Sequence, residues 1–247
     1  MKLLVSTLFL FSIHCLFAQW KESSINEYIQ ILQKSEAVIP KNASVSYDCN
    51  YRFFNTFDSP VPSSEEIGFF ESVQGKSFYV NQMGLEMAQS EKLCVVIDTL
   101  SKLISLKDPD TTLMSPKPLE MIELFKTSAI SVQKMETGKQ IKFSFQFVKG
   151  AKFAGAEIWF NQNYLVEKYI LFSATEVYNN PDFLGQGEVF LPKLEMVFSN
   201  YNLNRKSTSP KFKKPEDFVI LVNGSYELKD KISETELIDL RNKKQAQ

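Results

Sequence analysis

The sequence predicts an α+β domain in which most strands pair as antiparallel hairpins. Three observations lead to this class: long stretches in which apolar and polar residues alternate, short turn signals between those stretches, and two segments with the spacing of amphipathic helices. Roughly ten strands can be counted, mostly in meander order. The chain has no internal repeat and no low-complexity stretch, so we expect residues 19–240 to form one domain and residues 241–247 to form a polar tail.

The first predicted element is an amphipathic helix over residues 24–35. Ser24 and Glu27 have the spacing of a capping box, in which the serine side chain bonds the first helical turn. Pro40 ends the helical pattern. The apolar face of the helix contains Ile25, Tyr28, Ile29 and Leu32.

A long strand and a first group of shorter strands follow. In ASVSYDCNYRFFNTF, which begins at Ala43, apolar side chains at odd positions from Val45 to Phe53 alternate with polar ones. This period of two predicts a strand with one buried face. The further strands are predicted at residues 66–73, 77–88, 92–98 and 102–107.

A short helix and a second group of strands complete the predicted domain. PLEMIELFK starts with Pro118, which helices tolerate at their first position. The pattern of two then returns, most clearly in KQIKFSFQF, where four apolar residues from Ile141 to Phe147 alternate with polar ones. The strands of this group are predicted at residues 130–135, 139–147, 156–160, 164–172, 194–203 and 218–228.

Residues 1–18 have the pattern of a secretory signal peptide. Lys2 precedes an apolar run over residues 3–17, and Ala18 supplies the small residue before the cleavage point. The run is shorter than the roughly 20 apolar residues that a transmembrane helix needs. We therefore expect export to the periplasm, cleavage after Ala18, and no transmembrane segment in the mature chain.

Cleavage would also remove His14, the only histidine of the chain. The remaining residues cannot form a histidine base, a Ser-His-Asp triad or a histidine metal site. Carboxylates at Glu65-Glu66 and in KDPDTT (residues 107–112) lie in predicted turns, which favour such residues for backbone reasons. We expect no enzyme activity, no cofactor and no metal site.

The charge of the mature chain argues against nucleic acid as a partner. Loss of Lys2 leaves 27 basic and 29 acidic residues, a net charge of −2. Nucleic-acid binding requires a clustered basic surface, and a near-neutral chain of mixed sign gives no support for one.

Two cysteines, Cys49 and Cys94, remain after cleavage. Export permits a disulfide bond between them. In a simple meander, however, several strands separate their positions, and Cα atoms more than ~7 Å apart cannot be bridged. We expect two buried free thiols and leave the disulfide open.

The order of these elements resembles the periplasmic outer-membrane lipoprotein carrier (LolA-like) fold family. The similarity covers residues 20–204, and GKSFYVNQMGLEMAQSEKLCVVIDTLSKLISLKDPD (residues 75–110) is similar to the family's sheet before its mid-chain helix. The resemblance implies an incompletely closed antiparallel β-barrel, plugged by helices, that holds acyl chains on a concave aromatic face.

The main functional hypothesis is an exported periplasmic binding protein that holds a lipid or a lipidated protein. Its partner would be a lipid or acyl chain, or an envelope protein. Aromatic side chains at alternating strand positions would line the site. Strand parity places eight candidate ligand-binding residues on one face: Tyr47, Tyr51, Phe53, Phe143, Phe145, Phe147, Ile158 and Phe160.

A filled interior is the alternative, because aromatic residues at strand spacing ordinarily form a core. In that case the chain would be a non-catalytic scaffold or accessory subunit of a cell-envelope complex. Aromatic residues on the opposite strand face, such as Trp159, Phe54 and Tyr201, would then form an exposed partner surface.

Overall fold

The computed structural model describes residues 19–39, 43–74, 76–110, 119–178, 189–203, 208–229 and 235–241. The predicted signal peptide and residues 242–247 of the predicted tail lie outside these ranges. Among the described residues, no helix is long and apolar enough to cross a membrane.

The first group of strands forms an antiparallel meander in chain order. The prediction of one strand over residues 77–88 is wrong, because this segment forms two strands joined by a turn at Met83 and Gly84. Both residues have positive φ, 49° and 73°, which suits a two-residue hairpin turn. The strands are β2 (Val45–Phe54), β3 (Ser64–Val73), β4 (Ser77–Gln82), β5 (Leu85–Gln89), β6 (Cys94–Asp98) and β7 (Leu103–Lys107).

The second group begins with helix α2 (Leu119–Ser128) and continues as hairpins. Between its last two long strands lies a small separate ribbon, formed by β12 (Val177–Tyr178) and β13 (Val189–Phe190). The long strands are β8 (Ala129–Glu136), β9 (Gln140–Phe147), β10 (Phe153–Asn161), β11 (Val166–Ser173) and β14 (Lys193–Asn202).

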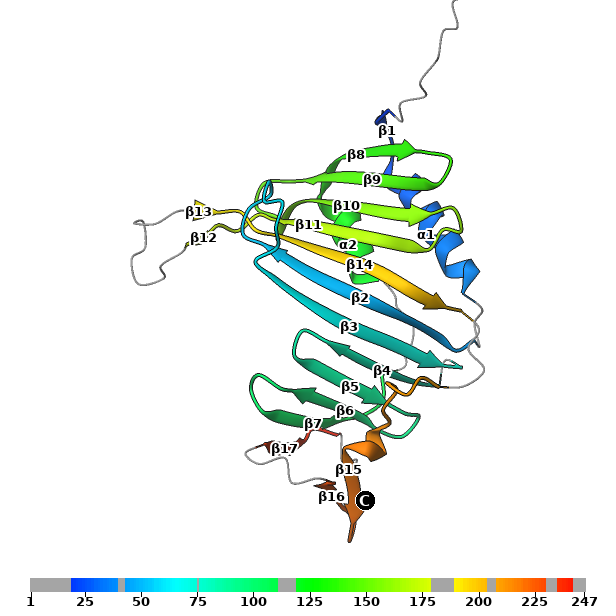
Figure 1. The fold of residues 1–247 in the computed structure, drawn as a ribbon, viewed down its shortest axis with the longest axis vertical. Coiled ribbons are helices and arrows are strands. Elements are labelled where there is room, and N and C mark those ends of the chain that lie inside the picture. Colours follow the sequence, from blue (N-terminus) through cyan, green and yellow to red (C-terminus); the bar gives the residue numbers. More distant parts are fainter. Residues whose placement is uncertain are drawn as a thin grey trace, which may run out of the picture.

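The two groups join because β14 pairs with β2, from Lys193 opposite Phe54 to Asn202 opposite Ser46. Two short strands extend the ends: β1 (Lys21–Glu22) pairs with β8, and β17 (Glu236–Asp239) pairs with β7 in parallel. The result is a 13-stranded sheet, in the order β1-β8-β9-β10-β11-β14-β2-β3-β4-β5-β6-β7-β17 (Figure 1). The sheet is mostly antiparallel and not closed, as predicted, but it has more strands than the ten expected.

Helix α1 (Ile25–Val38) begins as predicted, with the Ser24 hydroxyl accepting the Glu27 N–H at 3.2 Å. Together with α2 it covers one side of the sheet, at the end formed by β8 to β11 (Figure 1). We call this side the inner face and the opposite side the outer face. The main core therefore lies between the two helices and the inner face.

The C-terminal region packs on the outer face at the other end of the sheet. It contains a strap (residues 208–214), a 3-10 turn (Pro215–Asp217) and a hairpin of β15 (Val219–Val222) and β16 (Ser225–Leu228). The predicted strand over residues 218–228 is thus a hairpin, which turns at Asn223 and Gly224. A second core forms where this region covers β6 and β7, and its buried members are Leu93, Val95, Ile97, Ile104, Leu106 and Val219.

Candidate functional site

The inner face is filled where α1 and α2 cover it. Tyr28 of α1 lies between Phe143 and Phe145, with ring centroids 5.4 and 5.0 Å away, and Phe125 of α2 stacks on Phe145 at 4.7 Å. The predicted ligand residues of β9 and β10 belong to this core, with exposed fractions of 6% or less: Phe143, Phe145, Phe147, Ile158 and Phe160. This part of the face is plugged, and contact between these five side chains and a ligand stays a prediction.

The predicted residues of β2 share the same face but lie farther from the helices. Tyr47 is half-buried and stacks on Phe70 of β3 with a ring separation of 5.0 Å. The Tyr51 hydroxyl donates a hydrogen bond of 2.6 Å to the side-chain oxygen of Gln82, and Phe53 is half-buried. Burial raises the pKa of both tyrosines, so their hydroxyls stay neutral at physiological pH.

Beyond β3, the inner face carries apolar side chains that do not belong to the core under the helices. Val80 lies opposite Phe70, Met87 opposite Val80, and Val96 opposite Met87. The side chains of Val80, Met87 and Val96 are half-buried. We call the set Tyr47, Phe70, Val80, Met87 and Val96 the apolar row.

Aromatic contacts connect the apolar row with the plugged core. The Phe198 ring of β14 lies 5.7 Å from Tyr47 and 5.9 Å from Tyr169 of β11, in edge-to-face geometry with both. These ring contacts therefore link the apolar row with the core beneath α1.

Two polar atoms interrupt this apolar region at its covered end. The hydroxyls of Tyr28 and Tyr169 are buried and interact with each other, and neither has another hydrogen-bond partner among the described residues. The exposed fractions of the two residues are 0% and 6%. Burial raises the pKa of Tyr169 to about 12 and holds the pKa of Tyr28 well above its usual value, so both hydroxyls keep their protons.

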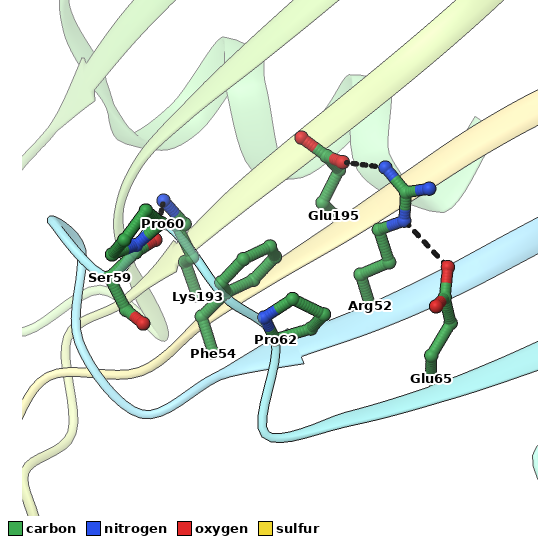
Figure 2. Close-up of a pocket in the computed structure, with 8 residues that line it drawn as sticks. All are labelled: Arg52, Phe54, Ser59, Pro60, Pro62, Glu65, Lys193 and Glu195. Atoms are coloured by element: carbon green, nitrogen blue, oxygen red, sulfur yellow. Dashed lines mark hydrogen bonds and ion pairs between the residues drawn. The ribbon is translucent and has the colours of Figure 1, made fainter.

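The outer face holds a pocket of about 370 Å³ between β2, β14 and the loop after β2 (Figure 2). Arg52 forms ion pairs with Glu65 at 2.8 Å and with Glu195 at 3.2 Å. Lys193 donates to the Phe57 carbonyl at 2.6 Å. The side chains lining the pocket are Arg52, Phe54, Ser59, Pro60, Pro62, Glu65, Lys193 and Glu195.

The charged groups of this pocket neutralise one another. Glu195 also accepts a hydrogen bond from Lys168 at 3.1 Å, so it lies between two cations. The hydrogen bonds of Arg52 with Glu65 and Glu195 raise the pKa of Arg52, and its guanidinium stays charged. Within the described ranges, no three His, Cys, Asp or Glu side chains gather in a metal-binding cluster.

The prediction that three aromatic residues form an exposed partner surface on the outer face is wrong for two of them. Phe54 is buried, at 7% exposed, beneath the Lys193 ammonium. Tyr201 lies on the inner face, 5.4 Å from the Tyr47 ring, because Asn200 has a φ of 55° and a bulge there reverses the strand parity. Trp159 does lie on the outer face, half-buried between Lys142 and Lys168.

Cys49 and Cys94 are both buried and free. They lie on β2 and β6, which are four strands apart in the sheet, or about 19 Å at the usual strand spacing. Burial raises the pKa of each thiol to about 11, which makes both poor nucleophiles.

No family model and no curated protein matches this sequence. Its fold is similar to that of several solved structures, including the following three. One is an uncharacterized conserved protein from Thermus thermophilus, with 12% identity, a TM-score of 0.39, and coverage of 76% of this chain and 97% of the other. Another is a LolA superfamily protein from Nitrosomonas europaea, with 10% identity, a TM-score of 0.26, and coverage of 72% and 94%.

The third is a domain described as an outer membrane lipoprotein-sorting protein from Vibrio parahaemolyticus, with 11% identity, a TM-score of 0.29, and coverage of 75% and 95%. The latter two descriptions name the fold family that the order of elements predicts.

Proposed function

We propose that this chain is an exported, non-catalytic binding protein that holds a lipid or a lipidated protein on the inner face of its sheet. The ligand's apolar part lies on the apolar row, beside the two helices rather than beneath them. Tyr47 of the predicted ligand set belongs to this site, while the five residues of β9 and β10 support it from within the core.

The observation that carries the proposal is the half-buried state of Val80, Met87 and Val96 next to a completely filled core. The outer face of β6 is already covered by the C-terminal region, so this strand is apolar on both sides. Burying an acyl chain on the inner side gains roughly 0.8 kcal/mol for each methylene group removed from water.

Native mass spectrometry of protein purified from its own periplasm tests the proposal. We expect an added lipid mass that disappears after delipidation. Met87→Lys should abolish this mass, because it places a charge in the apolar row. Ile67→Lys is the matched control, since Ile67 is 71% exposed on the outer face and its replacement leaves the row intact. A single ligand-free mass for the untreated protein contradicts the proposal.

A scaffold is the second candidate function, and the exposed tip of the β15-β16 hairpin favours it. Leu221 is 62% exposed and Ile220 is 41% exposed, although both lie in a strand. A scaffold would purify with another polypeptide and without lipid. Replacement of both residues by serine would then release that polypeptide and leave any lipid mass unchanged.

A further inference from the structure

The hairpin of β15 and β16 turns on two residues, Asn223 and Gly224. Val222 lies opposite Ser225 in the pairing register, so the turn consists of the two residues between them. Their φ values are 49° and 84°, and both residues are exposed. Positive φ at both central positions is the geometry of a type I′ turn, for which Asn-Gly is a preferred sequence. The same sequence places a side-chain amide next to an unhindered backbone nitrogen.

An asparagine that is followed by glycine can react with its own backbone. The backbone nitrogen of Gly224 attacks Cγ of Asn223, so that a new N–Cγ bond closes a succinimide ring while the Cγ–Nδ2 bond breaks. Ammonia leaves with the hydrogen of the Gly224 amide. Water then opens the ring at one of its two carbonyl groups. The product is aspartate when the N–Cγ bond breaks, and isoaspartate when the bond to the backbone carbonyl breaks.

The sequence and the structure both favour this reaction at residue 223. Asn223 is the only asparagine of the chain that is followed by glycine. Glycine leaves the attacking nitrogen unshielded, and a Cβ atom added to Gly224 would meet no atom within 4 Å beyond its chain neighbours. Asparagines elsewhere are held in place, since Oδ1 of Asn161 accepts two backbone N–H groups and Nδ2 of Asn200 donates to Asp48. We therefore expect Asn223 to react before these residues.

The hairpin opens most easily at its tip. Strands β15 and β16 form a separate sheet of two strands, and a two-stranded hairpin has little stability of its own. Closure of the succinimide ring requires the backbone of Asn223 to rotate out of the turn conformation. Local opening of the tip permits this rotation while the base of the hairpin stays anchored by Val219, which is 2% exposed. The reaction therefore does not require the whole protein to unfold.

The two products affect the hairpin differently. Aspartate leaves the backbone unchanged, and Asp-Gly is also a preferred type I′ sequence. Isoaspartate carries the chain through its side-chain carbonyl and so adds one methylene group to the turn. This insertion shifts the pairing of β15 with β16, whose residues Tyr226 and Leu228 pack against the second core. Isoaspartate therefore loosens the cover over β6 and β7, whereas aspartate keeps it.

We propose that Asn223 is a site of self-modification, and that its conversion to isoaspartate releases the β15-β16 hairpin from the outer face. Water is the co-reactant, and ammonia is the leaving group. The inference does not depend on what the inner face binds, because the hairpin packs on the opposite side of the sheet. It gives the C-terminal region a built-in limit on the lifetime of its fold.

Incubation of the folded protein at pH 8 tests the modification, and samples kept at pH 5 are the slow reference because the attacking amide must lose its hydrogen. Peptide mapping by mass spectrometry should show conversion of Asn223 before that of any other asparagine. Electron-transfer fragmentation should identify isoaspartate among the products. Asn223→Gly should give no product at this position, because Gly-Gly keeps the turn and lacks the amide. An unconverted Asn223, or equal conversion of Asn161, overturns the inference.

Hydrogen exchange tests the structural consequence. Aged wild-type protein should lose protection in β15, β16 and the covered strands β6 and β7, in proportion to its isoaspartate fraction. Freshly purified Asn223→Asp is the matched control, because it carries the charge of the products on an unaltered backbone, and it should be as protected as fresh wild type. Aged Asn223→Gly should also keep its protection, which excludes other damage during incubation. Full protection in the isoaspartate form, or an equal loss in Asn223→Asp, overturns the release of the hairpin.

Discussion

The carboxylate of Glu71 on β3 accepts the backbone N–H of Ser209 in the strap with both of its oxygens, at 3.0 and 3.1 Å. Glu71 has no exposed surface. Replacing it by alanine should leave the Ser209 N–H unpaired and lower the free energy of unfolding by about 1–3 kcal/mol. Urea denaturation measures this change. Glu227→Ala, at an exposed position of β16, should change stability by less than about 0.5 kcal/mol, and an equal effect at both sites would contradict the role of Glu71.

The strap is also held by charge pairs whose strength should depend on salt. Lys213 lies 2.8 Å from Glu86, a residue whose side chain is only 18% exposed. Lys213→Ala should destabilise the protein by about 0.5–1 kcal/mol at low salt and by less at 1 M salt. Lys76→Ala is the control, because the pair of Lys76 with Glu91 is 3.8 Å long and largely exposed. An effect that salt does not reduce would show that the Lys213 stem packs rather than pairs.

Gly155 of β10 should not tolerate a side chain. A Cβ atom there would lie 2.6 Å from the carbonyl oxygen of Phe145, and this backbone atom cannot move without disturbing the sheet. We expect Gly155→Ala to cost about 1–3 kcal/mol or more in thermal or urea unfolding. Gly138→Ala has open space around it and should be neutral or stabilising by up to about 1 kcal/mol. Equal stability of the two variants would mean that β9 and β10 lie farther apart than described.

The two thiols should react only after unfolding. Labelling of the native protein without reductant should give no modified cysteine, and labelling in denaturant should give two in a chain that has lost residues 1–18. No label in denaturant would show a disulfide between Cys49 and Cys94, and would require β2 and β6 to meet.

Because the pKa of both thiols is raised in the folded state, we expect the stability of the protein to decline at alkaline pH. Their pKa is raised from 9.0 to about 11 in the folded state, so the unfolded chain releases these protons first. Stability should be constant below pH 9 and should fall between pH 9 and 11, by up to about 1.4 kcal/mol per pH unit for each thiol. Cys94→Ala should reduce this slope, whereas a slope equal to that of the wild type would assign the decline to the buried tyrosines.

Mass spectrometry of the exported protein tests the compartment. The mature chain should begin at Gln19, without His14 or Cys15. A mass that retains residues 1–18 would contradict cleavage after Ala18 and would return the histidine to the working protein.

The sequence predicted the strands and their parity well where alternation was local. In β2 and β9 the odd positions do lie on one face, and the capping residue Ser24 was identified correctly. The alternation could not show which part of that face the helices cover. Val80 and Met87 were missed because residues 77–88 were predicted as one strand, and Val96 was missed because residues 94–97 are apolar on both faces and carry no alternation.

Some turns and strand pairings could not be predicted from local sequence patterns. The turn at Met83 and Gly84 uses a left-handed methionine, which no turn preference predicts. The Asn223-Gly224 turn, in contrast, was a readable hairpin signal within the predicted strand. The pairing of β14 with β2 and the parallel pairing of β17 depend on contacts between distant residues. The contact between Tyr28 of α1 and Tyr169 of β11 likewise joins elements far apart in the sequence.

The position of β17 has a consequence for the order in which the chain can fold. Strand β7 reaches its final neighbour only when Glu236 pairs with Leu103, so the 132 residues between them must be synthesised before β17 can cover the edge of β7. Until then, the free hydrogen-bonding groups of β7 are available to other nascent copies, as unpaired edges generally are. Chains interrupted shortly before residue 236 would therefore associate with one another, although every strand of both meanders is already present.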